Sequence, residues 1–272
     1  MKIEDARTAY LENPTQLLID STPELKTIVD FIAKYALRGV IGLSGGVDSA
    51  LVAALAVKAL GKENVFGLMM PAGNSAIDLE YAKRCAEQLG IKYEVIDLQP
   101  IVKVCEANTH DLFCSKIDAG NLKARLRMIH LYAAARRHKG IVLGTGNKSE
   151  DMIGYFTKYG DGGVDILPIA QLYKTQVWKL AKKVGVPDCI VKRIPTAGLW
   201  PGQTDEGELG IKYADLDKIL LGYELGFGVD EIAQINHIDA SIVQNIFRKI
   251  ADNAHKLAMP SSTKPKFEGG GK

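Results

Sequence analysis

The stretch "GVIGLSGGVDSALVAALAV", residues 39–57, decides the fold. It begins as a short apolar strand and ends in a helix that is expected to continue to residue 60. The glycine-containing turn Ser44–Ser49 joins the two. A strand, a glycine turn and a helix start together indicate a phosphate site, because the unpaired N–H groups of a helix N-terminus carry partial positive charge. The turn lacks the lysine of a Walker A loop and has Asp48 near that place.

The acid at the helix start is explained by a bridging metal. Gly45 and Gly46 let the backbone approach an anion closely, and Ser44 and Ser49 supply hydroxyl donors. Asp48 would repel a polyphosphate unless a divalent cation lay between them, and Mg²⁺ commonly joins carboxylates to phosphate oxygens. The alternative is that Asp48 only caps the helix and the glycines only make the turn.

Strands alternate with helices along most of the chain. This pattern predicts an α/β fold, a doubly wound parallel sheet of about five strands, Rossmann-like, with added N- and C-terminal helices. The expected strands are 39–44, 64–71, 92–98, 140–146 and 164–170. The expected helices are 2–12, 22–37, 48–60, 76–89, 99–108, 118–138, 173–184, 213–225, 228–235 and 239–257. We expect one domain, 1–260, followed by a flexible polar tail, 261–272.

The two most Gly- and Ser-rich strand exits are expected to meet. In a doubly wound sheet strand one neighbours strand four, because the winding reverses there. The loops after Leu43 and Leu143 would then flank one crevice at the carboxyl ends of their strands. Ligands of such sheets bind in that crevice.

Composition excludes several classes of function. The chain has 272 residues and a net charge of +2, so no general electrostatic attraction favours nucleic acid or an anionic membrane. Its apolar runs are far shorter than the ~20 residues of a membrane span. The start of the chain has no apolar signal-peptide core, so we expect a cytoplasmic protein. The four cysteines lie at no metal or redox spacing and are interpreted as reduced thiols.

The turn carries a family resemblance. "SGGVDS", residues 44–49, resembles the SGGxDS signature of the N-type ATP pyrophosphatases, whose fold is of the adenine nucleotide alpha hydrolase type. In that superfamily the loop grips the β,γ-pyrophosphate of ATP while the substrate oxygen attacks the α-phosphorus. The resemblance implies that the acid binds the Mg²⁺ of ATP.

Further motifs narrow the resemblance to one family, ammonia-dependent NAD synthetase. They are "GNLKARLRM" (120–128), "GTGNKSE" (144–150), "YFTKYGDGGVDILPI" (155–169), "LYKTQV" (172–177), "PTAGLWPGQTDEGELG" (195–210) and "HK" (255–256). The resemblance implies a homodimeric C–N ligase that adenylates the nicotinate carboxylate of deamido-NAD with ATP. Ammonia then displaces AMP to give NAD. No protein nucleophile is implied, so no residue is predicted to act as one.

The resemblance also implies a set of site residues. The ATP-binding residues would be Gly42, Leu43, Ser44, Gly45, Gly46, Val47, Asp48, Ser49, Thr145, Lys174 and Thr196. The metal ligands would be Asp48 and Glu150. The deamido-NAD-binding residues would be Arg125, Lys158, Asp165, His255 and Lys256.

Several of these side chains have ordinary structural explanations as well. Glu150 could be a solvated acid at a helix start, and Asp165 a turn acid. Lys158 and Lys174 could be surface lysines, and His255 could satisfy the carbonyls of a helix end. Arg125 and Arg127 lie two apart on a helix and cannot share a face; the resemblance selects Arg125 for the site.

Two larger expectations concern segments. Residues 196–210 are long, polar and Gly-containing, which favours a lid over the site. The terminal helical additions, 2–37 and 213–257, offer apolar faces that favour a subunit contact. The residues expected at that contact are Ile28, Phe31, Ile32 and Tyr35.

Two rival functions stay open on the sequence. One is another amidotransferase of the same ATP pyrophosphatase superfamily, acting on a different substrate. The other is a nucleotide-binding module of the same fold without chemistry. The presence of both Asp48 and Glu150 favours the enzyme.

Overall fold

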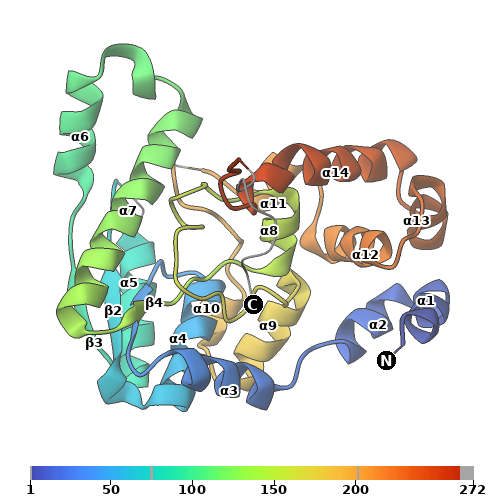
Figure 1. Ribbon diagram of the computed structural model, residues 1–272, viewed down its shortest axis with the longest axis horizontal. Helices are drawn as coiled ribbons and strands as arrows, with labels where there is room; N and C mark the ends of the chain where they lie inside the picture. The colour runs from blue at the N-terminus through green and yellow to red at the C-terminus, as the bar shows by residue number, and fades with distance from the viewer. Residues whose placement is uncertain (1, 74–75, 201, 264–272) are drawn as a thin grey trace.

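A four-stranded parallel sheet lies toward one end of the molecule, at the left of Figure 1. The computed structural model describes residues 2–73, 76–200 and 202–263. The strands are β1 (Gly39–Gly42), β2 (Val65–Met69), β3 (Lys92–Val95) and β4 (Ile141–Val142), in the order β3-β2-β1-β4. Strand β1 pairs in parallel with β2 on one side and with β4 on the other. The predicted neighbourhood of strands one and four is therefore confirmed.

The long helices lie close to their predicted bounds. They are α1 (Ile3–Glu12), α3 (Leu25–Tyr35), α4 (Val47–Leu60), α5 (Ala76–Leu89), α6 (Gln99–Asn108), α7 (Lys116–His138), α9 (Lys174–Lys183), α12 (Tyr213–Glu224), α13 (Val229–Asn236) and α14 (Ala240–Asn253). Short helices not predicted are α2 (Pro14–Asp20), α8 (Lys148–Ile153), α10 (Asp188–Val191) and α11 (Asp205–Leu209). Three 3-10 turns complete the list: η1 (Lys62–Asn64), η2 (His110–Phe113) and η3 (Ala254–Lys256).

Both faces of the sheet are covered because its central strands, β1 and β2, are buried and mostly apolar on both sides. Helix α4 follows β1 and is buried along most of its length, between the sheet, α3 and α9. On the other face α6 and α7 cover side chains such as Val40 and Leu68. This arrangement confirms the α/β class and leaves the carboxyl ends of β1 and β4 as the open edge between the layers.

The two ends of the chain form a second hydrophobic cluster beside the sheet (Figure 1). Helices α1 and α2 pack with α12, α13 and α14 around fully buried Tyr10 and Tyr213. Trp178 of α9 contacts both this cluster and the main core. Helices α1, α2 and α12 to α14 thus form one unit that α9 joins to the sheet, whereas α3, which also belongs to the predicted addition 2–37, packs on α4.

Two expectations are corrected. The predicted fifth strand, 164–170, is wrong: the segment makes only an isolated bridge between Leu143 and Ile166, because turns surround it. Of the side chains expected at a subunit contact, Ile28 and Ile32 are buried in the chain's own core, since α3 packs on α4. Only Phe31 and Tyr35 are exposed. Most of the predicted tail, 264–272, lies outside the described residues.

None of the helices in the described part of the chain is both long and apolar enough to cross a bilayer.

Candidate active site

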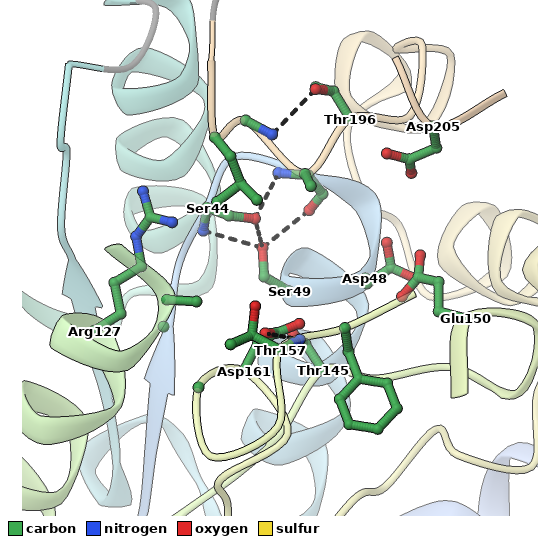
Figure 2. A pocket seen from close by; sticks show the side chains of 18 of the residues that line it. Ser44, Asp48, Ser49, Arg127, Thr145, Glu150, Thr157, Asp161, Thr196 and Asp205 are labelled. Atoms are coloured by element: carbon green, nitrogen blue, oxygen red, sulfur yellow. Dashed lines mark hydrogen bonds between the residues drawn. The ribbon is translucent and has the colours of Figure 1, made fainter. Parts of the chain in front are cut away.

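The turn between β1 and α4 is held in shape by its own side chains (Figure 2). The Ser44 and Ser49 hydroxyls lie 3.1 Å apart, and the Gly46 N–H donates to Ser44 Oγ at 3.2 Å. Ser49 Oγ donates to the Gly46 carbonyl at 3.0 Å. Gly45 has φ of 80°, and a Cβ there would lie 2.2 Å from the Asp78 carbonyl oxygen. The turn therefore requires glycine and is preformed at the start of α4.

Two carboxylates and one ammonium meet beside this turn. Lys174 Nζ lies 2.7 Å from Asp48 Oδ2 and 2.9 Å from Glu150 Oε1. Lys174 begins α9 and is only 2 % exposed. These three residues come from three different helices, so the tertiary fold alone brings them together. This arrangement speaks against a mere helix cap at Asp48 and a solvated acid at Glu150, because both carboxylates point inward to one cation.

The charged groups of this cluster shift one another's pKa values. Burial raises the pKa of the Glu150 carboxyl, with the Asp48 charge adding to the effect. Burial alone would lower the pKa of the Lys174 ammonium, but the two carboxylates outweigh it and raise that pKa above its ordinary value. Asp205 lies nearby, and burial raises its pKa as well. A site with this much negative charge accommodates a cation.

A buried hydrogen-bond network fixes the three charged residues. Asn147 Nδ2 donates to Asp48 Oδ1 at 2.9 Å, while Asn147 Oδ1 caps α8 at the Glu150 N–H. Asp217 of α12 accepts from the Ser149 hydroxyl at 2.5 Å and from the Thr175 N–H at 2.8 Å. Helices α8 and α9 are thereby locked to α12, which sets the positions of Glu150 and Lys174.

The cluster lies at one end of a cavity of about 490 Å³. This is the size of a pocket for a small ligand. Its apolar wall is formed by the ends of β1 and β2 and by α7, with Leu68, Met70, Met128 and Leu131 among the lining residues. Its polar end is the Ser44–Ser49 turn. An apolar slot that leads to a phosphate-type turn has the shape and chemistry for a nucleotide.

Most of the residues predicted for ATP and metal lie around this cavity. Those that line it are Gly42, Leu43, Ser44, Gly46, Val47, Asp48, Ser49, Thr145, Glu150, Lys174 and Thr196. Gly45 is buried behind the turn against α5. The predicted crevice at the switch point of the sheet is therefore present, and the roles of these residues stay predictions.

The residues predicted for deamido-NAD mostly lie on an adjoining surface. Lys256 lines the cavity, where its Nζ donates to the Gly154 carbonyl at 2.7 Å. Arg125 Nη2 approaches the Lys158 carbonyl at 3.4 Å, and Lys158 Nζ donates to the His255 carbonyl at 2.6 Å. Three of these four residues, Arg125, Lys158 and Lys256, carry positive charge and form a cationic row that leads out of the cavity.

Asp165 lies farther along the same surface. Its carboxylate accepts from the Val142 N–H at 2.7 Å and from the Tyr132 hydroxyl at 3.2 Å. Tyr132 and Arg125 are seven residues apart on α7 and therefore share a face. The predicted set is brought together on one exposed surface, although only Lys256 of the five lines the main cavity within the described residues.

Sequence reasoning missed several residues of the cavity. Arg127, not Arg125, reaches into it from α7, on the opposite side from Asp48 (Figure 2). Arg127 Nε donates to the Met70 carbonyl at 3.3 Å. Asp205 and Tyr213 join the charged cluster from the C-terminal helices. The spacing of Arg125 and Arg127 indicates only that they cannot both face the cavity. It does not show which of them does, and the resemblance selected Arg125.

The segment expected as a lid lies along the cavity. Pro195 to Trp200 line it, and Lys123 Nζ of α7 donates to the Leu199 carbonyl at 2.8 Å. The Tyr155 hydroxyl bonds to both Asp205 and Glu208 of α11. Closure of this segment over a ligand stays a prediction.

Known proteins resemble this chain along most of its length. A family model described as NAD synthase matches residues 24–260. An NH(3)-dependent NAD(+) synthetase of Pyrococcus horikoshii is 49% identical over 253 residues, covering 92% of this chain and 97% of the relative. A solved NMN synthetase from Francisella tularensis has a TM-score of 0.77 and 36% identity, over 89% of this chain and 97% of that one. A solved NH3-dependent NAD synthetase from Campylobacter jejuni, in complex with nitrate, has a TM-score of 0.73 and 31% identity, over 88% and 97%.

Proposed function

Since the chain belongs to the NAD synthase family, we propose that the cavity at the ends of β1 and β4 carries out the ATP-dependent amidation of deamido-NAD with ammonia. The enzyme is a ligase that forms a C–N bond and uses ATP. The single observation that carries the assignment of the site is the convergence of Asp48, Glu150 and Lys174 beside the preformed glycine turn.

The chemistry requires activation of a carboxylate. A carboxylate is a poor acyl donor because its leaving group would be oxide. The nicotinate carboxylate oxygen attacks the α-phosphorus of ATP, and the bond to pyrophosphate breaks. Ammonia then attacks the carbonyl carbon of the mixed anhydride, AMP leaves with the bonding electrons, and the new amide loses a proton. These steps need positioning and charge neutralisation, and no protein nucleophile.

Residues of the chain supply that positioning. The Ser44–Ser49 turn and the start of α4 bind the departing pyrophosphate through N–H and hydroxyl donors. Lys174 offsets its growing charge. The apolar wall at Leu68 and Met70 holds the adenine ring and excludes water, which would otherwise hydrolyse the adenylate.

A magnesium ion fits the donors present. Asp48 and Glu150 offer carboxylate oxygens that already share a cation, the Lys174 ammonium. Oxygen donors of this kind are what Mg²⁺ takes, together with phosphate oxygens. Bound there with ATP, the ion would neutralise phosphate charge.

The cationic row leads us to place deamido-NAD partly outside the cavity, at a homodimer contact. Arg125, Ile129 and Tyr132 share one exposed face of α7, with Ile129 56% exposed. An apolar face beside a cationic row suits a second copy of the chain with a dinucleotide between them. This surface replaces the contact expected at α3, where Ile28 and Ile32 are buried.

Mixed dimers test the shared site. Asp48→Asn and Arg125→Ala, each inactive alone, are co-expressed with different tags and the mixed dimer is purified. If Asp48 and Arg125 of one site come from different chains, up to one site per mixed dimer is intact and activity returns. A mixed dimer without activity shows that one chain supplies both residues, and a fully active monomer in light scattering refutes the dimer.

A second candidate substrate is nicotinate mononucleotide. The likeness to the solved NMN synthetase favours testing it, because that substrate has the same carboxylate without the adenylate half. The purified protein is given ATP, Mg²⁺ and ammonium with either deamido-NAD or nicotinate mononucleotide. We expect NAD, AMP and pyrophosphate in equal amounts from deamido-NAD and little product from the mononucleotide. A preference for the mononucleotide would overturn the substrate, and ADP with phosphate as products would overturn the reaction.

A further inference from the structure

Arg193 joins three separate segments beside the phosphate turn. It lies between α10 and Pro195, and it lines the cavity together with the residues that follow it. Its Nη1 donates to the Gly45 carbonyl at 3.3 Å, and its Nη2 forms an ion pair with Asp78 in the first turn of α5. The guanidinium also lies 5.8 Å from the centre of the Tyr81 ring. None of the roles assigned above uses this residue.

The contact with Gly45 fixes the orientation of one peptide group of the turn. A trans peptide is planar, so its carbonyl and its N–H point in opposite directions. The Gly45 carbonyl points toward Arg193, and the Gly46 N–H on the same peptide therefore points the other way, to Ser44 Oγ. Ser44 and Gly46 both line the cavity. Arg193 thus occupies the acceptor of this peptide, while the donor on its other side faces Ser44 at the cavity.

The ion pair also removes an unfavourable charge. Asp78 lines the cavity near the turn and its side chain is only 11% exposed. An unpaired carboxylate there would repel a polyphosphate. The side chain of Arg193 is 20% exposed, so the pair is largely shielded from solvent and not an ordinary surface contact.

We propose that Arg193 is a positioning residue for the polyphosphate of ATP: it orients the Gly45–Gly46 peptide and neutralises Asp78, and thereby keeps the turn ready to bind an anion. The proposal rests on the proposed use of ATP. Since Arg193 stands two residues before Pro195, it also links the turn to the start of the segment that lines the cavity.

The test measures binding of the α,β-methylene analogue of ATP by calorimetry, in the presence of Mg²⁺. We expect Arg193→Met to weaken this binding by about tenfold or more, because it leaves Asp78 unpaired and frees the Gly45 carbonyl. Arg193→Lys keeps the charge but can reach only one partner, so its loss should be smaller. Arg84→Met, an exposed position on the same helix α5 as Asp78, is the matched control and should bind like wild type.

Two further readouts separate positioning from a general loss of structure. The KM for ATP should rise in Arg193→Met while the KM for deamido-NAD stays within about twofold. Backbone amides of residues 44–47 should exchange hydrogen faster, with the rest of the sheet unchanged. If Arg193→Met does not fold, Arg193→Gln, which keeps an N–H donor for the Gly45 carbonyl but loses the charge, should show the same split to a smaller extent.

Three outcomes would overturn the proposal. One is a folded Arg193→Met that binds the analogue with wild-type affinity. Another is an equal rise in both KM values together with lost thermal stability, which shows a structural role only. The third is unchanged exchange at residues 44–47. Wild type that fails to bind the analogue at all would instead refute the proposed use of ATP, so the two failures are distinguishable.

Discussion

Replacing Lys174 with Met tests the charged cluster on which the proposed site depends. The ammonium is bonded to Asp48 and Glu150 at 2.7 and 2.9 Å, and Lys174 is 2 % exposed. A methionine side chain is similar in length to the aliphatic part of lysine and can occupy the same space. The substitution therefore removes the charge with little change in volume. It leaves two carboxylates facing each other without a cation.

The magnitude follows from burial. Removing one partner of a buried ion pair destabilises a protein by about 3–5 kcal/mol. The Asp48 and Glu150 side chains are 18% and 17% exposed, so water reaches them in part and the lower end applies. Burial already raises the pKa of Glu150, so that carboxyl can take up a proton and limit the cost. We expect Lys174→Met to lose about 3 kcal/mol in free energy of unfolding at pH 7.

Urea unfolding followed by circular dichroism measures this loss. Lys183→Met, an exposed lysine at the end of the same helix, is the matched control and should change stability by less than about 0.5 kcal/mol. Without the ammonium, Mg²⁺ can bind between the two carboxylates. In the absence of ATP, millimolar Mg²⁺ should therefore raise the stability of Lys174→Met but not that of wild type. A loss below about 1 kcal/mol, or equal Mg²⁺ responses in the two proteins, would refute the reasoning.

Three other substitutions give distinct outcomes. Gly45→Ala should destabilise the fold by about 1 kcal/mol more than Gly185→Ala in thermal unfolding, because both positions have positive φ but only Gly45 has a carbonyl 2.2 Å from the added Cβ; equal losses would contradict this. Burial raises the pKa of Asp217 to about 6 from its ordinary 3.8, so the folded state prefers the protonated acid and stability should fall by about 2 kcal/mol as pH rises from 4 to 6. Asp217→Asn should flatten that pH dependence, and an unchanged slope would show that Asp217 is not its source. Asp48→Asn should keep the fold but lose turnover by about 100-fold or more at limiting Mg²⁺, and wild-type rates there would remove the residue from the metal site.

Local sequence patterns were sufficient to predict the strand, turn and helix that frame the site. The apolar strand before Ser44, the glycine turn and the helix after it are consecutive in the chain, so their structure and the neighbourhood of β1 and β4 follow from spacing and from the winding rule. The segment 164–170 has the composition of a strand, but turns on both sides leave it a single bridge to Leu143. Amino-acid composition does not show that flanking turns will limit the pairing of a strand-like segment.

Long-range contacts explain what the sequence could not predict. Lys174 and Asp48 are 126 positions apart, and nothing in either local pattern shows that one cation lies between two carboxylates. The inward arginine of α7 depends on how that helix is rotated on the sheet, which periodicity with two basic residues leaves undecided. Arg193 follows a four-residue helix without any local motif, and only the packed fold brings it to Gly45.

The proposed reaction depends on an adenylated intermediate, whose formation can be followed by the transfer of an oxygen isotope. Deamido-NAD labelled with ¹⁸O in both oxygens of its nicotinate carboxylate is converted by the purified protein with ATP, Mg²⁺ and ammonium. The AMP formed is then analysed by mass spectrometry. If the carboxylate attacks the α-phosphorus, one labelled oxygen passes from each deamido-NAD to AMP, and the pyrophosphate carries none. Unlabelled AMP, or label in pyrophosphate or phosphate, would contradict the account.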